Sequence, residues 1–129
     1  MEQAPRLRLE NGIRVVNFSS PHPFRFDTGE ELEGCSPERC RILSLRREET
    51  EFPGPGGRWT DVVIGYSMTP EVLAELRDLE ADPEVDVILV PLPVMVSLRG
   101  LPDSGVTKAR TCILTDRVEK TVSSTRFGA

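Results

Sequence analysis

The polar residues best suited to binding chemistry gather around the only histidine of this 129-residue chain. His22 lies between two prolines, and the run Asn17-Phe18-Ser19-Ser20 comes before them. Each proline fixes its own φ and pushes the preceding residue toward extended geometry, so the corner is held in a defined conformation. Amide, hydroxyl and imidazole groups donate and accept the hydrogen bonds that orient a polar ligand. We call residues 17–22 the polar corner, and its predicted ligand-binding residues are Asn17, Ser19, Ser20 and His22.

Arginine side chains supply the positive charge that an anionic ligand would need at this corner. Arg25, Arg46 and Arg99 complete the predicted site, because a guanidinium group can bind phosphate oxygens in pairs. The sequence therefore predicts a site for a small anionic, nucleotide-like ligand. The alternative interpretation is a capped turn, in which Asn17 and the serines satisfy backbone groups while His22 lies on the surface or packs.

Covalent and metal chemistry are less well supported by the residue pattern. One histidine beside two serines is not a catalytic triad, and the chain has no Gly-x-Ser-x-Gly elbow, which favours a non-catalytic protein. Cys35, Cys40 and Cys112 could in principle form a zinc site with His22. The favoured interpretation is that Cys35 and Cys40 flank a Ser-Pro turn while Cys112 is buried in a strand. We predict neither a metal nor a cofactor.

Composition and charge narrow the classes of partner. The net charge of −5 argues against binding a nucleic acid polymer, which requires a basic surface. No apolar run approaches the roughly 20 residues of a membrane span, and the N-terminus has no apolar signal core, so we expect a cytoplasmic protein without membrane contact. The length of 129 residues predicts a single domain over 1–129.

Alternating apolar and polar residues predict strands in the first half of the chain. Residues 5–10 and 13–18 flank Asn11-Gly12, which is typical of a tight antiparallel hairpin. A further strand is expected over about 40–48. The Pro-Gly-rich segment 52–57 predicts an exposed loop or hairpin tip.

The second half combines strands with a well-defined helix. Residues 60–66 resemble a buried strand, Thr69 and Pro70 begin an amphipathic helix over about 70–81, and a strand over 85–90 follows, which together resemble a crossover. Residues 94–98 fit either a short helix or a strand, and 109–114 with 118–123 predict another hairpin, followed by a frayed tail or a docked strand end. The predicted fold is α+β, a mainly antiparallel β-sheet with one inserted helix and a short second one.

The segment from Val16 to Phe24 resembles the opening of a family of small, mostly uncharacterised phage and bacterial proteins. These proteins begin with a strand that leads into Asn-Leu-Thr-Pro-His and an apolar residue. Weaker similarity continues later in the chain. Val87–Val90 and Val94–Leu98 resemble an apolar strand that enters a short helix in these proteins, and Cys112–Val122 resembles their final two strands with an Asp-containing turn. This chain has an additional serine before Pro21 and an inserted helix at 70–81. The resemblance implies a phage or mobile-element context, in which such proteins neutralise host machinery or capture a signalling nucleotide.

The sequence therefore predicts three alternative functions. The first is a non-catalytic, phage-encoded protein of the host cytoplasm that holds a nucleotide-like ligand. The second is a protein-interaction module that inhibits a host enzyme through an exposed sheet edge or the Pro-Gly loop. The third is a structural virion protein. A homo-oligomer is compatible with each of them.

Overall fold

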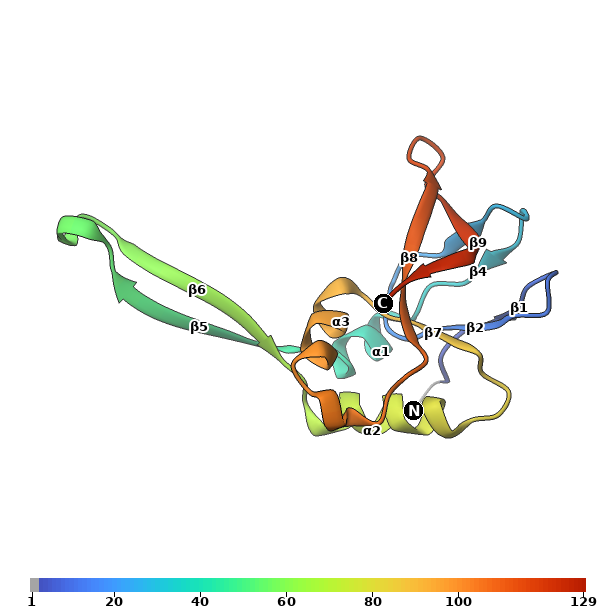
Figure 1. Cartoon of the computed structure of the whole chain (residues 1–129), viewed down its shortest axis with the longest axis horizontal. Helices are drawn as coiled ribbons and strands as arrows, with labels where there is room; N and C mark the ends of the chain where they lie inside the picture. Colours follow the sequence, from blue (N-terminus) through green and yellow to red (C-terminus); the bar gives the residue numbers. More distant parts are fainter. Residues whose placement is uncertain (1–2) are drawn as a thin grey trace.

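Strands from both halves of the chain form one mixed sheet with the order β1-β2-β7-β8-β9-β3-β4 (Figure 1). The structure is a computed structural model that describes residues 3–129. The strands of this sheet are β1 (Arg6–Arg8), β2 (Arg14–Asn17), β3 (Phe24–Phe26), β4 (Glu31–Leu32), β7 (Val87–Leu89), β8 (Ala109–Asp116) and β9 (Thr121–Gly128). The helices are α1 (Pro37–Ile42), α2 (Pro70–Ala81) and α3 (Leu92–Arg99). The predicted α+β class is confirmed.

The remaining two strands, β5 (Arg46–Pro53) and β6 (Thr60–Ser67), form a separate two-stranded sheet. They extend far from the other elements as a long ribbon (Figure 1). We call residues 46–67 the arm and the rest of the described chain the body. The tip of the arm is a 3-10 turn at Pro55–Gly57, which confirms the predicted hairpin tip within 52–57.

The sheet of the body has a core on each face because successive strand residues point to opposite sides. Val16 and Ile88 pack on the side of the helices, together with Leu76 of α2. Their neighbours Val15 and Leu89 pack into a second core on the other face. The second core also includes Leu9, Phe26, Leu32 and Val122, which come from both ends of the strand order. The sheet must therefore curl around this second core.

The predicted helix over 70–81 is confirmed as α2. Thr69 caps its first turn, with Oγ1 accepting a hydrogen bond from the Val72 amide at 3.4 Å, and Pro70 occupies the first position. The ambiguous run 94–98 lies within α3, which confirms the short second helix. Both terminal hairpins are also confirmed, by the antiparallel pairs β1 with β2 and β8 with β9. The C-terminal segment is a docked strand end, because β9 continues to Gly128.

Three details of the prediction are wrong. Residues 37–42 form α1 and not the start of a strand, because Ser36 caps this helix through its side chain and Pro37 fits its first turn. Residues 60–66 do form a strand, but it is exposed. Since β6 pairs with β5 alone among the described strands, 60–90 is not a crossover within one sheet. The helical crossover between adjacent parallel strands is instead formed by β7, α3 and β8.

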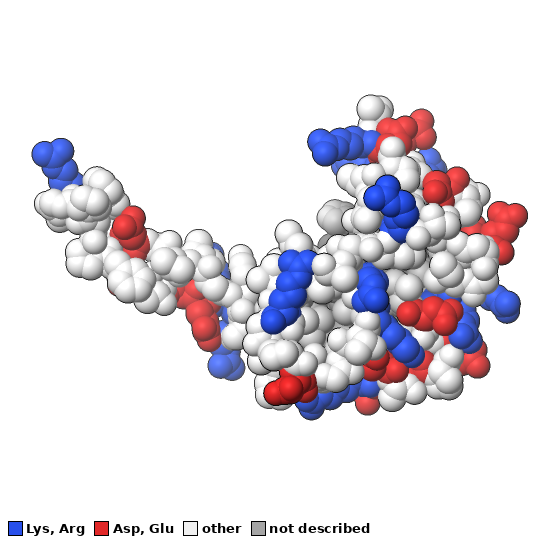
Figure 2. Space-filling view, in the orientation of Figure 1, with Lys and Arg blue, Asp and Glu red and all other residues white. Residues whose placement is uncertain are grey.

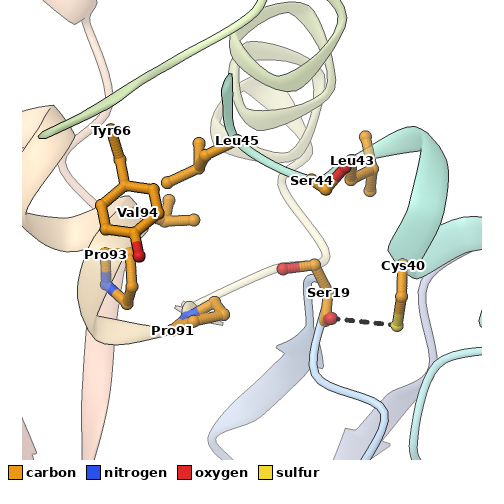
Figure 3. A pocket seen from close by; sticks show the side chains of 9 residues that line it. All are labelled: Ser19, Cys40, Leu43, Ser44, Leu45, Tyr66, Pro91, Pro93 and Val94. Carbon is orange, nitrogen blue, oxygen red and sulfur yellow. Dashed lines mark hydrogen bonds between the residues drawn. The ribbon is translucent and has the colours of Figure 1, made fainter. Parts of the chain in front are cut away.

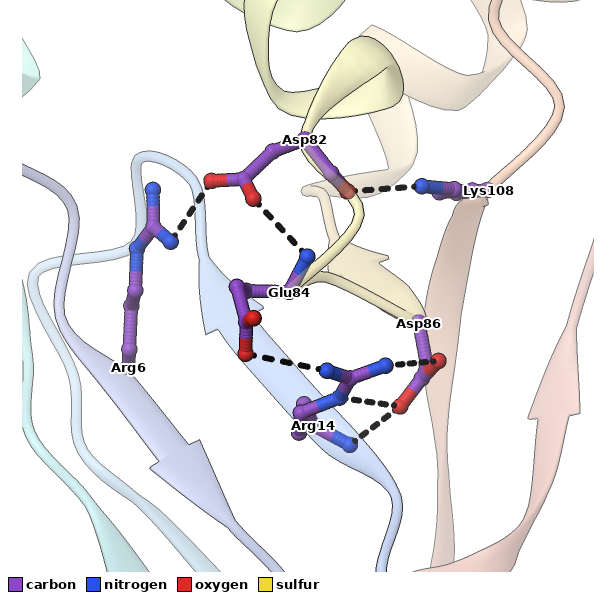
Figure 4. A network of polar contacts seen from close by, with 6 residues as sticks. All are labelled: Arg6, Arg14, Asp82, Glu84, Asp86 and Lys108. Carbon is purple, nitrogen blue, oxygen red and sulfur yellow. Dashed lines mark hydrogen bonds and ion pairs between the residues drawn. The ribbon is translucent and has the colours of Figure 1, made fainter.

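An ion network joins the first hairpin to the loop that follows α2 (Figure 4). Arg14 bonds both carboxylate oxygens of Asp86, at 3.0 and 3.1 Å, and one oxygen of Glu84 at 3.1 Å. The side-chain and backbone hydrogen bonds from Arg14 lower the pKa of Asp86 to about 2. Asp82 accepts from the Glu84 amide and from Arg6, and these bonds lower its pKa as well. The network therefore holds carboxylates in their charged form where β2 meets β7.

Candidate functional site

Asn17 of the polar corner is completely buried at the end of β2. Its side-chain amide donates to the backbone oxygens of Ser20 at 3.1 Å and Glu33 at 2.9 Å, and more weakly to His22 at 3.4 Å. Its Oδ1 accepts from the Ser20 amide at 3.0 Å. These bonds tie together three backbone segments, so Asn17 holds the shape of the corner from inside. This arrangement agrees with the capped-turn interpretation of this residue.

Phe18 is buried like Asn17, whereas Ser19, Ser20 and His22 lie nearer the surface. His22 is exposed, and its backbone amide donates to Ser20 Oγ at 3.2 Å. Ser19 is half-buried, and its backbone oxygen accepts a hydrogen bond from the Cys40 thiol at 3.1 Å. The corner thus presents the imidazole of His22 to solvent, while Asn17 is turned inward.

The three predicted arginines come from three separate elements. Arg25 is exposed on β3, where it pairs with Thr121 of β9. Arg46 begins β5 at the base of the arm, opposite Ser67. Arg99 ends α3 and donates to the backbone oxygen of Ala129 at 2.5 Å. No hydrogen bond that is described among residues 3–129 connects any of the three to the polar corner.

Arg39 of α1 is the arginine that packs directly against the corner, and the sequence-based site omitted it. Its side chain is only 1% exposed. Nε donates to the Phe18 backbone oxygen at 3.0 Å, Nη2 pairs with Glu75 of α2 at 2.9 Å, and the guanidinium lies 5.7 Å from the Phe18 ring centre. Removing one partner of such a buried pair leaves an uncompensated charge. Arg39 therefore fixes α1, α2 and the polar corner relative to one another.

The cysteines are described as free thiols. Cys35 is buried and donates to the Asn17 backbone oxygen at 3.2 Å, and its burial raises the pKa of the thiol. Cys112 lies on β8, where burial raises its pKa to about 11. A thiol with a raised pKa is a poor nucleophile at neutral pH. Among residues 3–129 no group of three His, Cys, Asp or Glu side chains is placed to hold a metal ion.

A pocket of about 310 Å³ lies between the polar corner and the base of the arm. Ser19 and Cys40 lie on one side of it, and Tyr66 lies on the other with Pro93 and Val94 (Figure 3). The remaining lining residues are Leu43, Ser44, Leu45 and Pro91. The lining is mainly apolar and includes none of the described arginines, so it offers shape and a hydroxyl group but no cation for a phosphate.

The arm exposes apolar side chains on both of its faces. The strand register places Val62, Ile64 and Tyr66 of β6 on one face of the arm. Their cross-strand neighbours on that same face are Glu51, Glu49 and Arg47 of β5. The other face carries Phe52 and Val63, with Trp59 at the tip. These six apolar side chains are between 44% and 57% exposed. Charged side chains are spread over the visible face of the body, whereas that of the arm is mostly uncharged (Figure 2).

A second pocket of about 310 Å³ lies where the arm meets α3. Leu92 and Val96 of α3 are 62% and 55% exposed, and they continue the apolar surface of β6 onto the body. The pocket is lined by Ile64, Gly65, Tyr66, Leu92, Pro93, Val96 and Ser97. Tyr66 and Pro93 line both pockets, so the base of the arm lies between two apolar hollows.

No protein-family model, curated protein or solved structure matches this chain. The resemblance of the polar corner to phage and bacterial proteins stays a prediction. Among residues 3–129, no helix combines the length and the apolar character needed to cross a membrane.

The sequence indicated part of the arm but not its exposure. Two strands of similar length beside a Pro-Gly segment are a hairpin signal, and the predicted tip at 52–57 was correct. Three consecutive apolar residues, Val62, Val63 and Ile64, are typical of a strand covered on both faces. Nothing in the local pattern distinguishes a strand covered by its own fold from one that projects into solvent.

Proposed function

We propose that this protein is a non-catalytic protein-interaction module that binds another protein through its arm. The observation that carries the proposal is the exposure of apolar side chains on both faces of a ribbon of two eight-residue strands. An isolated two-stranded hairpin is at best marginally stable in water, and it needs further strands or a packed face. Contiguous exposed apolar surface on a soluble protein marks a place where another molecule docks.

The charge of the arm favours a protein over a nucleic acid. Residues 46–67 contain three arginines (Arg46, Arg47 and Arg58) and four acidic residues (Glu48, Glu49, Glu51 and Asp61), which gives a net charge of −1. A ribbon that binds nucleic acid must neutralise phosphates with a surplus of positive charge. A host enzyme as the target stays a prediction, and the edge strands and Pro-Gly tip of the arm are the features that support it.

The proposal is tested by a binding assay with Ile64→Lys as the arm variant. The tagged full-length chain is incubated with an extract of its host cell and, separately, with an untagged second copy of itself. We expect the wild-type protein to retain a stoichiometric protein in one of these assays, and Ile64→Lys to retain at most about a tenth as much, because a buried unpaired charge opposes docking.

Val118→Lys is the matched control, because Val118 is 91% exposed in the β8–β9 turn, away from the arm. This variant should retain as much protein as the wild type. If the wild type retains no protein in either assay, or if Ile64→Lys and Val118→Lys behave alike, the proposed function is wrong.

A small-ligand function is the second candidate, and it is favoured by the position of Ser19 at the edge of the pocket in Figure 3. A nucleotide-like ligand at 100 times its dissociation constant should stabilise the fold by about 2.7 kcal/mol. A thermal-shift series over cyclic and linear nucleotides measures this directly. The absence of any shift would remove the nucleotide from consideration and leave the arm as the functional surface.

A further inference from the structure

The two edges of the arm differ in their capacity to pair with a second copy. When the same strand of two copies pairs antiparallel, a two-fold axis perpendicular to the sheet relates the copies. The residue at which this axis passes lies directly opposite its own counterpart in the second copy. If the axis passes through residue 46 or 47 of β5, an arginine lies opposite the same arginine of the second copy. If it passes through residue 48, 49 or 51, a glutamate lies opposite the same glutamate. An axis at Thr50 opposes Glu49 with Glu51. An axis at Phe52 or Pro53 opposes no like charges, but it involves Pro53, which has no N–H to donate to a partner strand. Like charges directly opposite destabilise a strand pair, so the charges and Pro53 together protect β5 against pairing with itself.

The β6 edge has no such protection. Asp61 is its one charged residue between Thr60 and Ser67. With the axis at Val62, Asp61 lies opposite Val63 of the second copy and Ile64 lies opposite Thr60. No like charges meet in this register, and the β-branched residues suit a paired strand.

The direction of the backbone groups identifies the open part of this edge. The Gly54 amide donates to the Trp59 backbone oxygen at 2.8 Å, so this is a hydrogen-bonded pair of the hairpin. Such pairs alternate along an antiparallel ladder, which turns the backbone groups of Thr60, Val62 and Ile64 away from β5. At Tyr66 the same edge is covered, because Ser97 of α3 donates to the Tyr66 backbone oxygen at 3.2 Å. The open stretch is therefore centred on Val62.

We propose that a second copy of this chain pairs its β6 antiparallel with β6 around a two-fold axis at Val62. This inference rests on the proposed function, since it names the partner of the arm. The two hairpins become one four-stranded sheet, which exceeds the three strands that a stable isolated sheet needs. The apolar stripes of the two arms then lie on the same face and extend each other.

In the same register, the tip of the second arm meets the apolar pocket at the base of the first arm. With the axis at Val62, Trp59 of the second copy lies beside Gly65, which has open space where a side chain would be. The tip of the second arm thus reaches the hollow between β6 and the exposed Leu92 and Val96 of α3. Each body receives the tip of the other arm, and the dimer contains two identical tip contacts.

Sedimentation velocity of the full chain tests the dimer. We expect the wild type to have twice the monomer mass of 14.4 kDa at high micromolar concentration. Val62→Lys places two ammonium groups opposite each other at the axis and should raise the dimer dissociation constant at least about tenfold. Glu51→Lys is the matched control, because Glu51 lies opposite Val62 on the other strand of the same arm. It should leave the dimer intact.

Cross-linking identifies the register. In a hydrogen-bonded antiparallel pair the opposed Cα atoms are about 5.5 Å apart, which a disulfide can span. Under oxidation by diamide, which takes up the two hydrogens lost by the thiols, Val62→Cys should form a covalent dimer. Glu51→Cys and the wild type, with its three native cysteines, should not.

The outcomes separate this inference from the proposed function. A monomeric wild type that retains a host protein through Ile64 would overturn the β6 dimer and leave the proposed function standing. A monomeric wild type that retains no protein would overturn both. A dimer that persists in Val62→Lys, or cross-links through Glu51→Cys instead, would also overturn the pairing through β6. Circular dichroism of Val62→Lys should match the wild type, because the arm lies outside both cores.

Discussion

Phe18 and Phe52 illustrate how differently the body and the arm use the same residue type. Phe18 is fully buried in the core beneath the helices, beside the guanidinium of Arg39. Phe52 is 51% exposed on β5, with no core beneath it. The body hides its apolar residues on two faces of one sheet, whereas the arm displays them on both faces of a ribbon. The body therefore accounts for the stability of the fold, and the arm is the part with apolar surface left for a partner.

The largest expected effect is on the free energy of unfolding, in which substitutions of these two phenylalanines should differ most. Phe18→Ala should lower the free energy of unfolding by about 3–5 kcal/mol, because it leaves a cavity in a packed core. Phe52→Ala should change it by about 0.5 kcal/mol or less, as is typical of surface substitutions. Urea unfolding of both variants measures the difference. Losses of equal size would show that the arm is part of the stabilising core, like the body.

The sequence predicted those parts of the fold that local patterns encode. Thr69 and Pro70 marked the start of α2, and Asn11-Gly12 marked the first hairpin, because caps and turns depend on a few adjacent residues. Burial depends on what another element covers. Val63 and Val16 are both β-branched strand residues, yet one is 57% exposed and the other 1%.

The candidate site was less predictable for the same reason. Asn17 does lie at the end of a strand, and Ser19 lines a pocket, while their role in binding a ligand stays a prediction. The contact of Arg39 with Phe18 joins residues 21 positions apart, and its pair with Glu75 spans 36 positions. Such contacts follow from the packing of α1 and α2 against the sheet, which no local spacing reports.

A smaller effect is expected within the polar corner, where Asn17 and His22 can be compared. Asn17→Ala should cost about 1–3 kcal/mol of stability, because it leaves the half-buried Ser20 amide and two backbone oxygens without their partner. His22→Ala should leave stability nearly unchanged, since its side chain is exposed. Thermal unfolding of both variants measures this. A large loss with His22→Ala and none with Asn17→Ala would reverse the assignment of Asn17 as the internal clamp.

The smallest expected effect is the change in stability when an ion pair is removed, and it should differ between a pair of the body and a pair of the arm. Asp86 is held by three hydrogen bonds from Arg14, whereas Glu49 of the arm pairs with Arg47 at 3.0 Å, with both side chains about half exposed. The Asp86 side chain is itself 41% exposed, so the two pairs differ in the number of hydrogen bonds rather than in burial. An exposed pair with a single contact contributes little to stability. Asp86→Asn should therefore lower the stability at neutral pH, and Glu49→Gln should not do so measurably.

The Asp86 and Glu49 ion pairs should also differ in how they affect the pH dependence of stability. The pKa of Asp86 is about 2 in the folded protein against 3.8 for the free group, so the folded state favours its charged form. A lowered pKa contributes stability above the unfolded value, and this contribution is lost as the pH falls from 3.8 toward 2. Asp86→Asn lacks the titrating group, so its stability should fall less steeply than that of the wild type across this interval. Urea unfolding at a series of pH values measures both slopes, with Glu49→Gln expected to follow the wild type. Parallel curves for Asp86→Asn and the wild type would mean that the Arg14 contacts do not stabilise the charged carboxylate, and that the body and arm ion pairs are equivalent.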